Sequence, residues 1–487
     1  MKKIEVNYTK PFVNGEYTVA PNSDSLPVYC PVDDSVICEV HTSPTSQIDE
    51  AVAAARAALP VWNGLNAELK SAAMRRVAEE IRKRNDLIGD LETYNTGIPI
   101  ATTKGHFANR SAVLFEYFSG MPDKLHGRTI PIDPNFSTMT IHEPLGVVAA
   151  LLPWNAPFPE LCMAVSAAIA CGNAIVVKPA TDTPLTALVL GDICNAAGLP
   201  PGLVNIVLGR GGEIGEYIAA HPGIDKVSFT GGNETGKTVL RAGADTLKGF
   251  TLELGGKTPV IVCEDADVDF AAAQASFSSV RNSGQICTAA ARLFVQNSIA
   301  DRFVEDVLER MKQYQIGDPF DPATVLGPMV SKRHQRSVLD HIERGKESGA
   351  KLLLGGNAPT EGALKDGYFV NPTLFDHVDH ASSLAQEEIF GPVLSVFRYE
   401  TLEEAMALAN DVKYGLAASI FTSNIKNAQY FIENSQAGIS WVNCINLSHP
   451  AISHGGFKES GLGIQNGMDA ALYSYTRIKT VWMNKKV

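Results

Sequence analysis

The segment that begins at Gly146 constrains the fold more than any other part of the chain. It contains the apolar runs VVAALL, AIVV, NIVL and KVSF, separated by alanine- and leucine-rich stretches of helical length. Short, near-continuous apolar strands that alternate with helices are typical of a parallel sheet. The sequence therefore predicts an α/β fold with a doubly wound parallel sheet.

A second α/β series follows Gly255. The runs TPVIVCEDA, RLFVQ and SVFRYE indicate strands, and the segment ERMKQY indicates a helix. A chain of 487 residues also exceeds what one hydrophobic core usually supports. We therefore expect two domains, with the boundary in or just after LELGGK, residues 252–257.

Two further regions show other patterns. Apolar residues recur at helical spacing from Gln47 to Leu59 and again from Asn66, the expected cap, to about Leu91. Between Thr129 and His142 the pattern becomes an alternation around a Pro-Asn turn, which predicts a β-hairpin. Because an isolated hairpin is marginally stable, it should pair with something else, such as another subunit.

Charge and cysteine usage exclude several classes of protein. The net charge is −12 and we find no cluster of Lys and Arg, which argues against a nucleic-acid partner. The absence of a signal peptide and of an eighteen-residue apolar run predicts a cytoplasmic protein with no membrane partner. The eight cysteines form no CxxC pair or Cys/His cluster, so we expect neither disulfides nor a metal site.

Chemically useful residues follow the predicted strands. Asn155 lies in PWNAPF, Lys178 in KPAT, and Gly231 and Gly236 in TGGNETG. Ligands of doubly wound sheets bind at the carboxyl ends of the strands. Each residue also has an ordinary interpretation: a turn asparagine, a solvated lysine and a plain strand-to-helix turn.

Cys287, in SGQICTAA, and Glu253, in LELGG, form a candidate pair. A free cysteine is usually a buried, inert residue, and a thiol of pKa about 8.5 needs a local base or dipole to act as a nucleophile. Glu253 is flanked by leucines and glycines, a setting that raises a carboxyl pKa towards that of a general base. The small residues after Cys287 predict a helix.

The ordered motifs PWNAPF, KPA, FTGGNETG, LELGGK, GQIC, EEIFGPV and GGFKESG resemble the signature of the NAD(P)-dependent aldehyde dehydrogenase superfamily. The resemblance implies that Cys287 attacks the aldehyde to form a thiohemiacetal. Asn155 and the backbone N–H of Cys287 would stabilise the oxyanion. Hydride transfer would leave a thioester, which water activated by Glu253 would hydrolyse to the acid.

The resemblance also implies a domain plan. It assigns residues 1–122 and 145–254 to an NAD(P)-binding domain, 255–444 to a catalytic domain, and 123–144 and 466–487 to a β oligomerisation extension, giving a homodimer or homotetramer. The implied cofactor-binding residues are Trp154, Lys178, Thr181, Gly231, Gly236, Glu388 and Phe390. The implied substrate-lining residues are Phe158, Glu160, Met163, Ile286 and Thr288.

The chain departs from the family pattern at several positions. Thr181 stands where many relatives have a glutamate that repels a 2′-phosphate, so we expect use of NAD or NADP, with Lys178 pairing with the phosphate. Gln465 stands where many relatives have a second glutamate, so Glu253 would work alone. Glu160 would suit a cationic aldehyde or simply a helix start, whereas Ile286 favours an apolar or aromatic aldehyde.

Two alternatives remain open at this stage. A dehydrogenase that passes its thioester to coenzyme A, or to phosphate, commonly lacks the hydrolytic glutamate, which Glu253 supplies here. A catalytically silent aldehyde dehydrogenase fold with a binding or structural role would have lost Cys287, Asn155 or Glu253, and all three are present.

Overall fold

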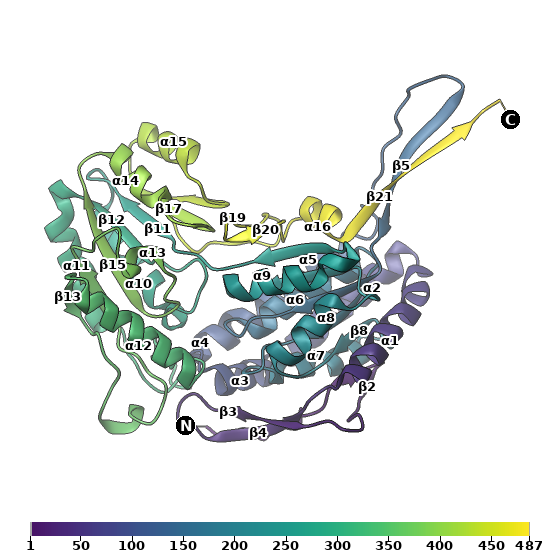
Figure 1. Cartoon of the computed structure of the whole chain (residues 1–487), viewed down its shortest axis with the longest axis horizontal. Coiled ribbons are helices and arrows are strands. Elements are labelled where there is room, and N and C mark those ends of the chain that lie inside the picture. Colours follow the sequence, from purple (N-terminus) through teal and green to yellow (C-terminus); the bar gives the residue numbers. More distant parts are fainter. Residues whose placement is uncertain (1, 487) are drawn as a thin grey trace.

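The computed structural model describes residues 2–486, arranged as two lobes with a projecting arm (Figure 1). The first lobe contains an eight-stranded sheet in the order β2-β1-β8-β7-β6-β9-β10-β20. Its five central strands, β8 to β10 in that order, are parallel, and its outer strands are antiparallel. The predicted doubly wound parallel sheet is therefore confirmed. The central strands are β6 (Val147–Leu151), β7 (Ala174–Lys178), β8 (Val204–Ile206), β9 (Lys226–Thr230) and β10 (Gly249–Glu253); the outer strands are β1 (Phe12–Val13), β2 (Glu16–Tyr17) and β20 (Gly461–Leu462).

The order of these strands creates a binding crevice. From central β6 the chain steps through β7 to β8 on one side, then returns to place β9 and β10 on the other. Right-handed crossovers therefore put α6 (Pro157–Ala170) and α7 (Leu185–Ala196) on one face, and α8 (Glu216–Ala220) and α9 (Asn233–Gly243) on the other. The reversal beside β6 is the switch point at which such sheets bind ligands.

Helix packing buries this sheet on both faces. Every residue of β6 and β7 is buried, as is nearly all of α6. The helices α1 (Thr45–Asn63), α2 (Ala67–Lys83), α3 (Asn85–Thr96), α4 (Ile100–Thr102) and α5 (Ala108–Ser119) complete the lobe. Asn66 caps α2, as expected, by accepting a hydrogen bond from the Leu69 N–H. The single helix expected up to Leu91 is wrong, because the chain breaks it at Arg84.

The second lobe contains a seven-stranded sheet in the order β13-β14-β15-β12-β11-β17-β18, parallel except at β13. Alternate residues of β11 face two separate cores, since Val260 and Val262 join one and Ile261 the other. Its strands are β11 (Pro259–Val262), β12 (Arg292–Gln296), β13 (Lys351–Leu354), β14 (Thr373–Asp376), β15 (Val393–Tyr399), β17 (Ala417–Phe421) and β18 (Ile439–Val442). Its helices are α10 (Val268–Val280), α11 (Ala300–Gln313), α12 (Lys332–Glu347), α13 (Ser383–Gln386), α14 (Leu402–Asn410) and α15 (Ile425–Asn434).

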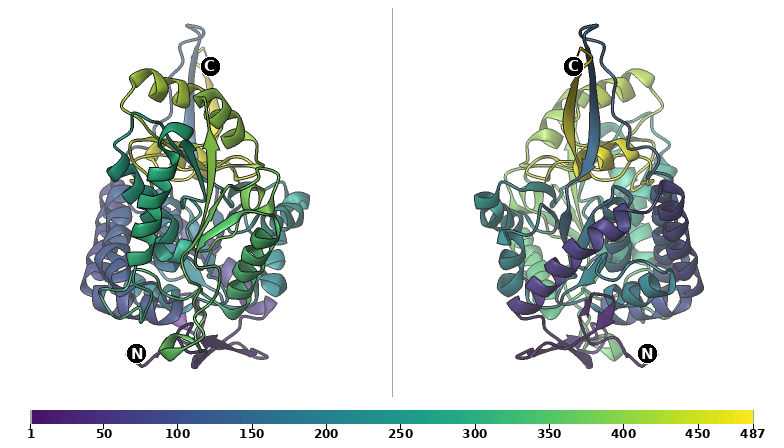
Figure 2. Two further views of the ribbon diagram at one scale, coloured as in Figure 1. Left: turned by 90° about the vertical axis from the view of Figure 1, so that its left-hand side faces the viewer. Right: turned by 90° about the vertical axis from the view of Figure 1, so that its right-hand side faces the viewer.

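The projecting arm is a two-stranded ribbon of β5 (Phe136–Pro144) and β21 (Thr476–Asn484), which stands clear of both lobes (Figures 1 and 2). The predicted hairpin is wrong in its first half: residues 129–133 form no regular strand, only a bridge between Thr129 and Met139. Pro131 removes a backbone donor there. Strand β5 instead pairs with β21, from the other segment assigned to the extension, over nine residue pairs.

The chain crosses between the lobes again near its end. Strand β20 joins the first sheet and α16 (Met468–Tyr475) packs on α6, with Ala471 and Tyr475 in the first core. Both segments lie outside the ranges predicted for the cofactor-binding domain, whose boundaries stay a prediction. The remaining short strands are β3 (Ser25–Tyr29) paired with β4 (Val36–His41), and β16 (Tyr414–Gly415) paired with β19 (Phe457–Lys458).

Within residues 2–486, no helix combines the length and apolar character that crossing a membrane requires. The same residues contain no group of three or more His, Cys, Asp or Glu side chains placed to hold a metal ion.

Candidate active site

Cys287 lies in a loop between α10 and β12, so the helix predicted after it is wrong. Asn282, Ser283 and Gly284 before it all have positive φ angles, of 50°, 54° and 73°. Such conformations cost of order 1–3 kcal/mol each for residues other than glycine and persist only where the surroundings enforce them. Here the Ser283 hydroxyl donates to the Gly327 carbonyl at 2.7 Å, which anchors the turn that aims Cys287.

Asn155 follows β6 at the switch point and contacts this loop. Its Nδ2 donates to the Gln285 carbonyl at 3.0 Å, and Asn282 Nδ2 in turn donates to the Asn155 carbonyl at 3.0 Å. The second N–H of the Asn155 amide remains available for another acceptor. The structure therefore brings together an amide donor and the half-buried thiol, which the sequence could place only on separate segments.

Glu253 is the last residue of β10 and is 5% exposed. Neither of its carboxylate oxygens has a hydrogen-bond partner, although His454 Nε2 lies 3.7 Å from Oε2. Burial, with the negative charge of Glu160 added, raises the pKa of Glu253 well above its usual range. These surroundings therefore favour the protonated form of Glu253.

The electrostatics of the thiol follow from the same burial. Burial is the main cause that raises the pKa of Cys287, and the charges of Glu160, Glu388 and Glu253 raise it further. Burial also raises the pKa of Glu160 to about 7, a shift that Arg110 opposes. These interactions place the thiol and three carboxyl groups in one small region. Burial therefore favours the uncharged forms of both the Cys287 thiol and the Glu253 carboxyl.

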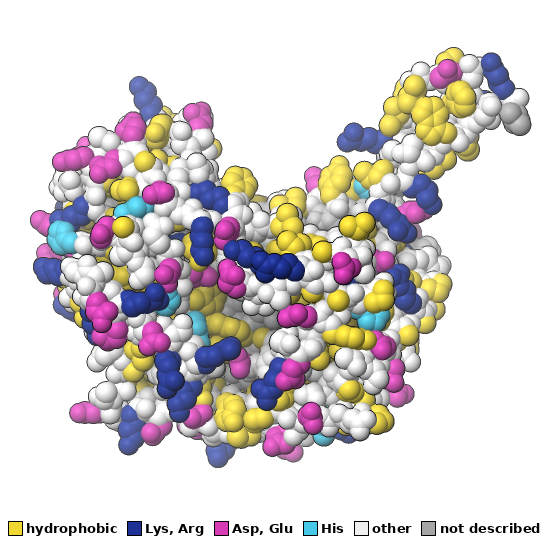
Figure 3. Space-filling model, in the orientation of Figure 1, with side chains coloured by type: hydrophobic (Ala, Val, Ile, Leu, Met, Phe, Trp, Pro, Cys, Tyr) yellow, Lys and Arg dark blue, Asp and Glu magenta, His cyan; other side chains and the backbone are white. Residues whose placement is uncertain are grey.

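A cluster of rings lies on the cofactor side of the switch point. Trp154 and Phe390 contact edge to face, with ring centroids 5.3 Å apart, and His334 of α12 lies 4.9 Å from Trp154. His334 Nε2 donates to the Phe390 carbonyl at 2.8 Å and supports the positive φ of 57° at Phe390. The molecular surface is hollowed between α12 and α9 (Figure 3). Burial lowers the pKa of His334, which keeps its ring neutral.

Glu388 lies between the two lobes, where Gly255 leaves room for its carboxylate. Its Oε1 accepts from the Gly256 N–H at 2.8 Å, and a side chain at Gly255 would collide with its carboxylate. Burial raises the pKa of Glu388 to about 7. The glycines of LELGGK thus serve the site directly, since a side chain at Gly256 would collide with the Cys287 carbonyl.

Lys178 and Thr181 follow β7 on the other side of the switch point. Lys178 is 5% exposed, its Nζ donates to the Pro179 carbonyl at 2.9 Å, and burial lowers its pKa to about 8. The Thr181 hydroxyl donates to the Gly209 carbonyl at 3.2 Å. Lys178 is therefore not a solvated surface lysine, because a buried ammonium group with spare donors favours a polar ligand.

The glycines of TGGNETG have distinct environments. A side chain at Gly231 would collide with Phe229, and one at Gly236 with Leu254, so both permit close packing between strand and helix. Gly232 instead faces open space at the start of α9. Lys237 is paired with Glu234 and Glu459 on the surface. Exposed N–H groups at Gly232 and the first turn of α9 suit a phosphate.

The predicted substrate-lining residues separate into two groups. Glu160, Met163 and Ile286 are partly exposed, and Thr288 is held by Asn446, whose Nδ2 lies 2.9 Å from both its carbonyl and its hydroxyl. Phe158 is fully buried in the first core and has no surface free to contact a substrate, so its predicted role is wrong.

Sequence reasoning missed four polar residues at this site: Arg110, Arg281, His334 and His454. None lies in a motif, and each reaches the site only through tertiary packing. Gln465 was predicted to replace a relay glutamate. Its side chain turns to Ser228, at 3.4 Å, while its backbone pairs with that of His454.

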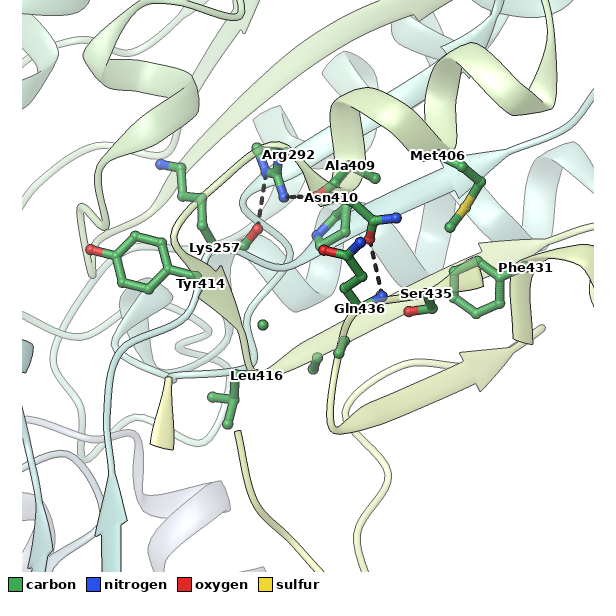
Figure 4. A pocket seen from close by; sticks show the side chains of 15 residues that line it. Lys257, Arg292, Met406, Ala409, Asn410, Tyr414, Leu416, Phe431, Ser435 and Gln436 are labelled. Carbon is green, nitrogen blue, oxygen red and sulfur yellow. Dashed lines mark hydrogen bonds between the residues drawn. The ribbon is translucent and has the colours of Figure 1, made fainter. Parts of the chain in front are cut away.

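One pocket of the second lobe lies apart from these residues (Figure 4). Its wall includes Arg292, whose guanidinium donates to the carbonyls of Lys257, Leu408 and Ala409 at 2.7–3.0 Å. Neither Cys287 nor Asn155 nor Glu253 lines it. Arg292 therefore joins β12 to α14 as a structural cation.

Comparison with known proteins agrees with this geometry. The model of the aldehyde dehydrogenase family matches residues 18–481, and human retinal dehydrogenase 2 is 40% identical over 98% of this chain and 92% of its own length. The chain belongs to the aldehyde dehydrogenase family, a family of enzymes that oxidise aldehydes.

Solved structures give the same result. PnpE in complex with nicotinamide adenine dinucleotide superposes with a TM-score of 0.97 at 36% identity, covering 99% of this chain and 98% of that one. Betaine aldehyde dehydrogenase from Staphylococcus aureus, with NAD+ bound and a modified cysteine, gives 0.96 at 33% identity over 99% and 98% of the two chains. The α/β fold is therefore shared along the whole chain.

Proposed function

We propose that this enzyme converts an aldehyde to its carboxylic acid with Cys287 as the nucleophile, Asn155 as an oxyanion donor and Glu253 as the base for hydrolysis. The observation that supports this most strongly is the contact of Asn155 with the loop of Cys287, because it joins the switch point of one lobe to the nucleophile of the other. Glu253 reaches the same region from β10.

The site residues carry the reaction in two halves. Cys287 releases its proton to solvent as its sulfur bonds to the aldehyde carbon. The free N–H of Asn155 and the N–H of Cys287 hold the resulting oxyanion. A dinucleotide held by Trp154, Phe390 and Glu388 would supply the acceptor for the hydride that the thiohemiacetal carbon loses, which leaves a thioester on Cys287. Glu253, once ionised, takes a proton from water as the water attacks the thioester, and the Cys287 thiolate leaves.

The described residues fit a dinucleotide. Gly232 leaves open space at the start of α9, where N–H groups suit the pyrophosphate, and Trp154, Phe390 and Glu388 would hold the nicotinamide end. Lys178 would bind the adenine ribose. Thr181 offers no carboxylate to repel a 2′-phosphate, so we propose use of both NAD and NADP.

We also propose that the β5–β21 ribbon joins copies of this chain into a homodimer or homotetramer. Its exposed apolar residues support this: Ile141, Ile478, Trp482 and Met483.

The test is the absorbance of reduced nicotinamide with a panel of aldehydes, using the wild type, Cys287→Ala and Glu253→Gln. We expect no turnover from Cys287→Ala, and from Glu253→Gln a burst followed by slow turnover as acyl-enzyme accumulates. Turnover by Cys287→Ala would refute the nucleophile. A product that forms only when coenzyme A is added would favour the acylating alternative.

A further inference from the structure

Two arginines stand beside the approach to Cys287. Arg110, near the start of α5, donates from Nη1 to the Ser448 hydroxyl at 2.7 Å. Ser448 follows Asn446 by two residues, and Asn446 holds Thr288, the neighbour of the nucleophile. Arg281 begins the turn that leads to Cys287. The two therefore reach the nucleophile loop from separate segments of the chain.

The two guanidinium groups are also close to each other. The positive charge of Arg110 adds to the effect of burial in lowering the pKa of Arg281, and both arginines contribute to the lowered pKa of His106. Arg110 also acts on Glu160, whose charge raises the pKa of Cys287. The arginine pair therefore lies within electrostatic range of the group next to the thiol.

Neither arginine forms an ion pair within residues 2–486. No carboxylate lies within 4.0 Å of either guanidinium, and Arg281 makes no side-chain hydrogen bond although it is partly buried. Arg292, the buried arginine of the second lobe, shows the usual solution, with three carbonyls as acceptors. Two adjacent, partly buried cations without anions are costly unless a ligand supplies the negative charge.

The other titratable groups do not cancel this charge. Burial, with Arg110 adding to it, lowers the pKa of His454 to about 4, so its ring is neutral. Burial raises the pKa of Glu253 well above its usual range, which favours its uncharged form. Glu160, with a pKa of about 7, is only partly ionised at neutral pH. The approach to Cys287 is therefore positive overall, which disfavours the cationic aldehyde that Glu160 alone would suit.

We propose that Arg110 and Arg281 bind a carboxylate at the far end of the substrate, so that the preferred substrates are semialdehydes of dicarboxylic acids. This inference rests on the proposed function, because it requires the aldehyde end to reach Cys287. Guanidinium groups present planar pairs of N–H donors that match a carboxylate, and Ser448 adds a hydroxyl beside Arg110. The exposed Leu447 and Ile452 flank this region and suit an intervening carbon chain.

The experiment compares three length-matched aldehydes: glutarate semialdehyde, pentanal and 5-aminopentanal. It measures kcat/KM for the wild type, Arg110→Met, Arg281→Met and the control Arg302→Met, whose side chain is exposed on α11. We expect the wild type to prefer glutarate semialdehyde to pentanal by about 10- to 100-fold, the effect of one or two charge-assisted hydrogen bonds. Each site variant should reduce that ratio by at least about tenfold, and Arg302→Met should not.

The outcomes separate this inference from the proposed function. Turnover of pentanal at least as efficient as that of glutarate semialdehyde, or a ratio unchanged in both site variants, would overturn the arginine pair and leave the dehydrogenase intact. If no aldehyde is oxidised, protection of Cys287 from iodoacetamide by glutarate tests the pair independently of turnover. Protection that disappears in Arg281→Met would support the pair, and no protection would overturn it.

Discussion

Replacing Glu92 by Gln should make the thermal stability of the enzyme less sensitive to alkaline pH. Glu92 is fully buried on α3, where Oε1 accepts from the Phe158 N–H at 3.0 Å and Oε2 has no partner. Burial raises the pKa of Glu92 from 4.5 to about 7. The unfolded chain therefore releases this proton near pH 4.5, while the folded protein keeps it until about pH 7.

Within that window the stability contributed by the buried proton falls as pH rises. A shift from 4.5 to about 7, at 1.36 kcal/mol per pKa unit, gives a total loss of about 3 kcal/mol above pH 7. Gln keeps the acceptor for Phe158 and carries no proton to lose. The entropy of unfolding is about 2.1 cal/mol/K per residue, or about 1 kcal/mol/K for 487 residues that unfold cooperatively. Divided by this entropy, the difference of about 3 kcal/mol corresponds to a shift of roughly 3 °C in Tm.

The assay is the melting temperature of the wild type and Glu92→Gln at pH 4.5 and pH 8, followed by calorimetry. The variant should gain about 3 °C relative to the wild type between the two pH values, whatever fixed offset the substitution causes. The substitution Glu79→Gln, at an exposed glutamate of α2, serves as a control and should show no such gain. A difference between Glu92→Gln and the wild type that is constant with pH would refute the argument from the buried proton.

Three further predictions concern the site and the ribbon. Glu160→Gln should move the acidic limb of the pH–rate profile to lower pH by roughly one unit, since a nearby charge is removed from Glu253 and Cys287; an unmoved limb would contradict this. Thr181→Glu should lower kcat/KM with NADP relative to NAD by at least about tenfold, and equal losses with both cofactors would count against the 2′-phosphate argument. Trp482→Glu should reduce the oligomer to smaller species in light scattering, and an unchanged mass would exclude the ribbon as the contact.

Most of the fold could be predicted from the sequence because the patterns that determine its strands and helices are local. The buried strands of the first sheet are short apolar runs, and Asn66 caps its helix through its own side chain. The errors arose where tertiary contacts override local pattern. The helix expected up to Leu91 breaks at Arg84, and the small residues after Cys287 lead into β12 as a loop, in which the Ala291 N–H donates to the Thr258 carbonyl at 3.2 Å.

Only some residues of the site could be predicted from the sequence, and the difference between these residues and the others has a physical cause. Cys287, Asn155 and Glu253 lie in motifs at strand ends or turns, whose positions follow from the topology. Arg110, Arg281 and His454 are single polar residues on otherwise ordinary segments, and their meeting depends on how α5, α10 and the segment near residue 450 pack. Phe158 shows the reverse case, a motif residue whose side chain points into the core.

The ribbon has a consequence for the order of events during synthesis. Residues that meet across the ribbon lie far apart in the sequence. Lys479 donates to the Glu143 carboxylate, and the two residues are separated by 336 positions in the sequence. Strand β5 leaves the ribosome early and must wait for β21 before the ribbon can form. The arm should therefore form only after β21 has been synthesised, so that assembly through the arm excludes chains that lack this strand.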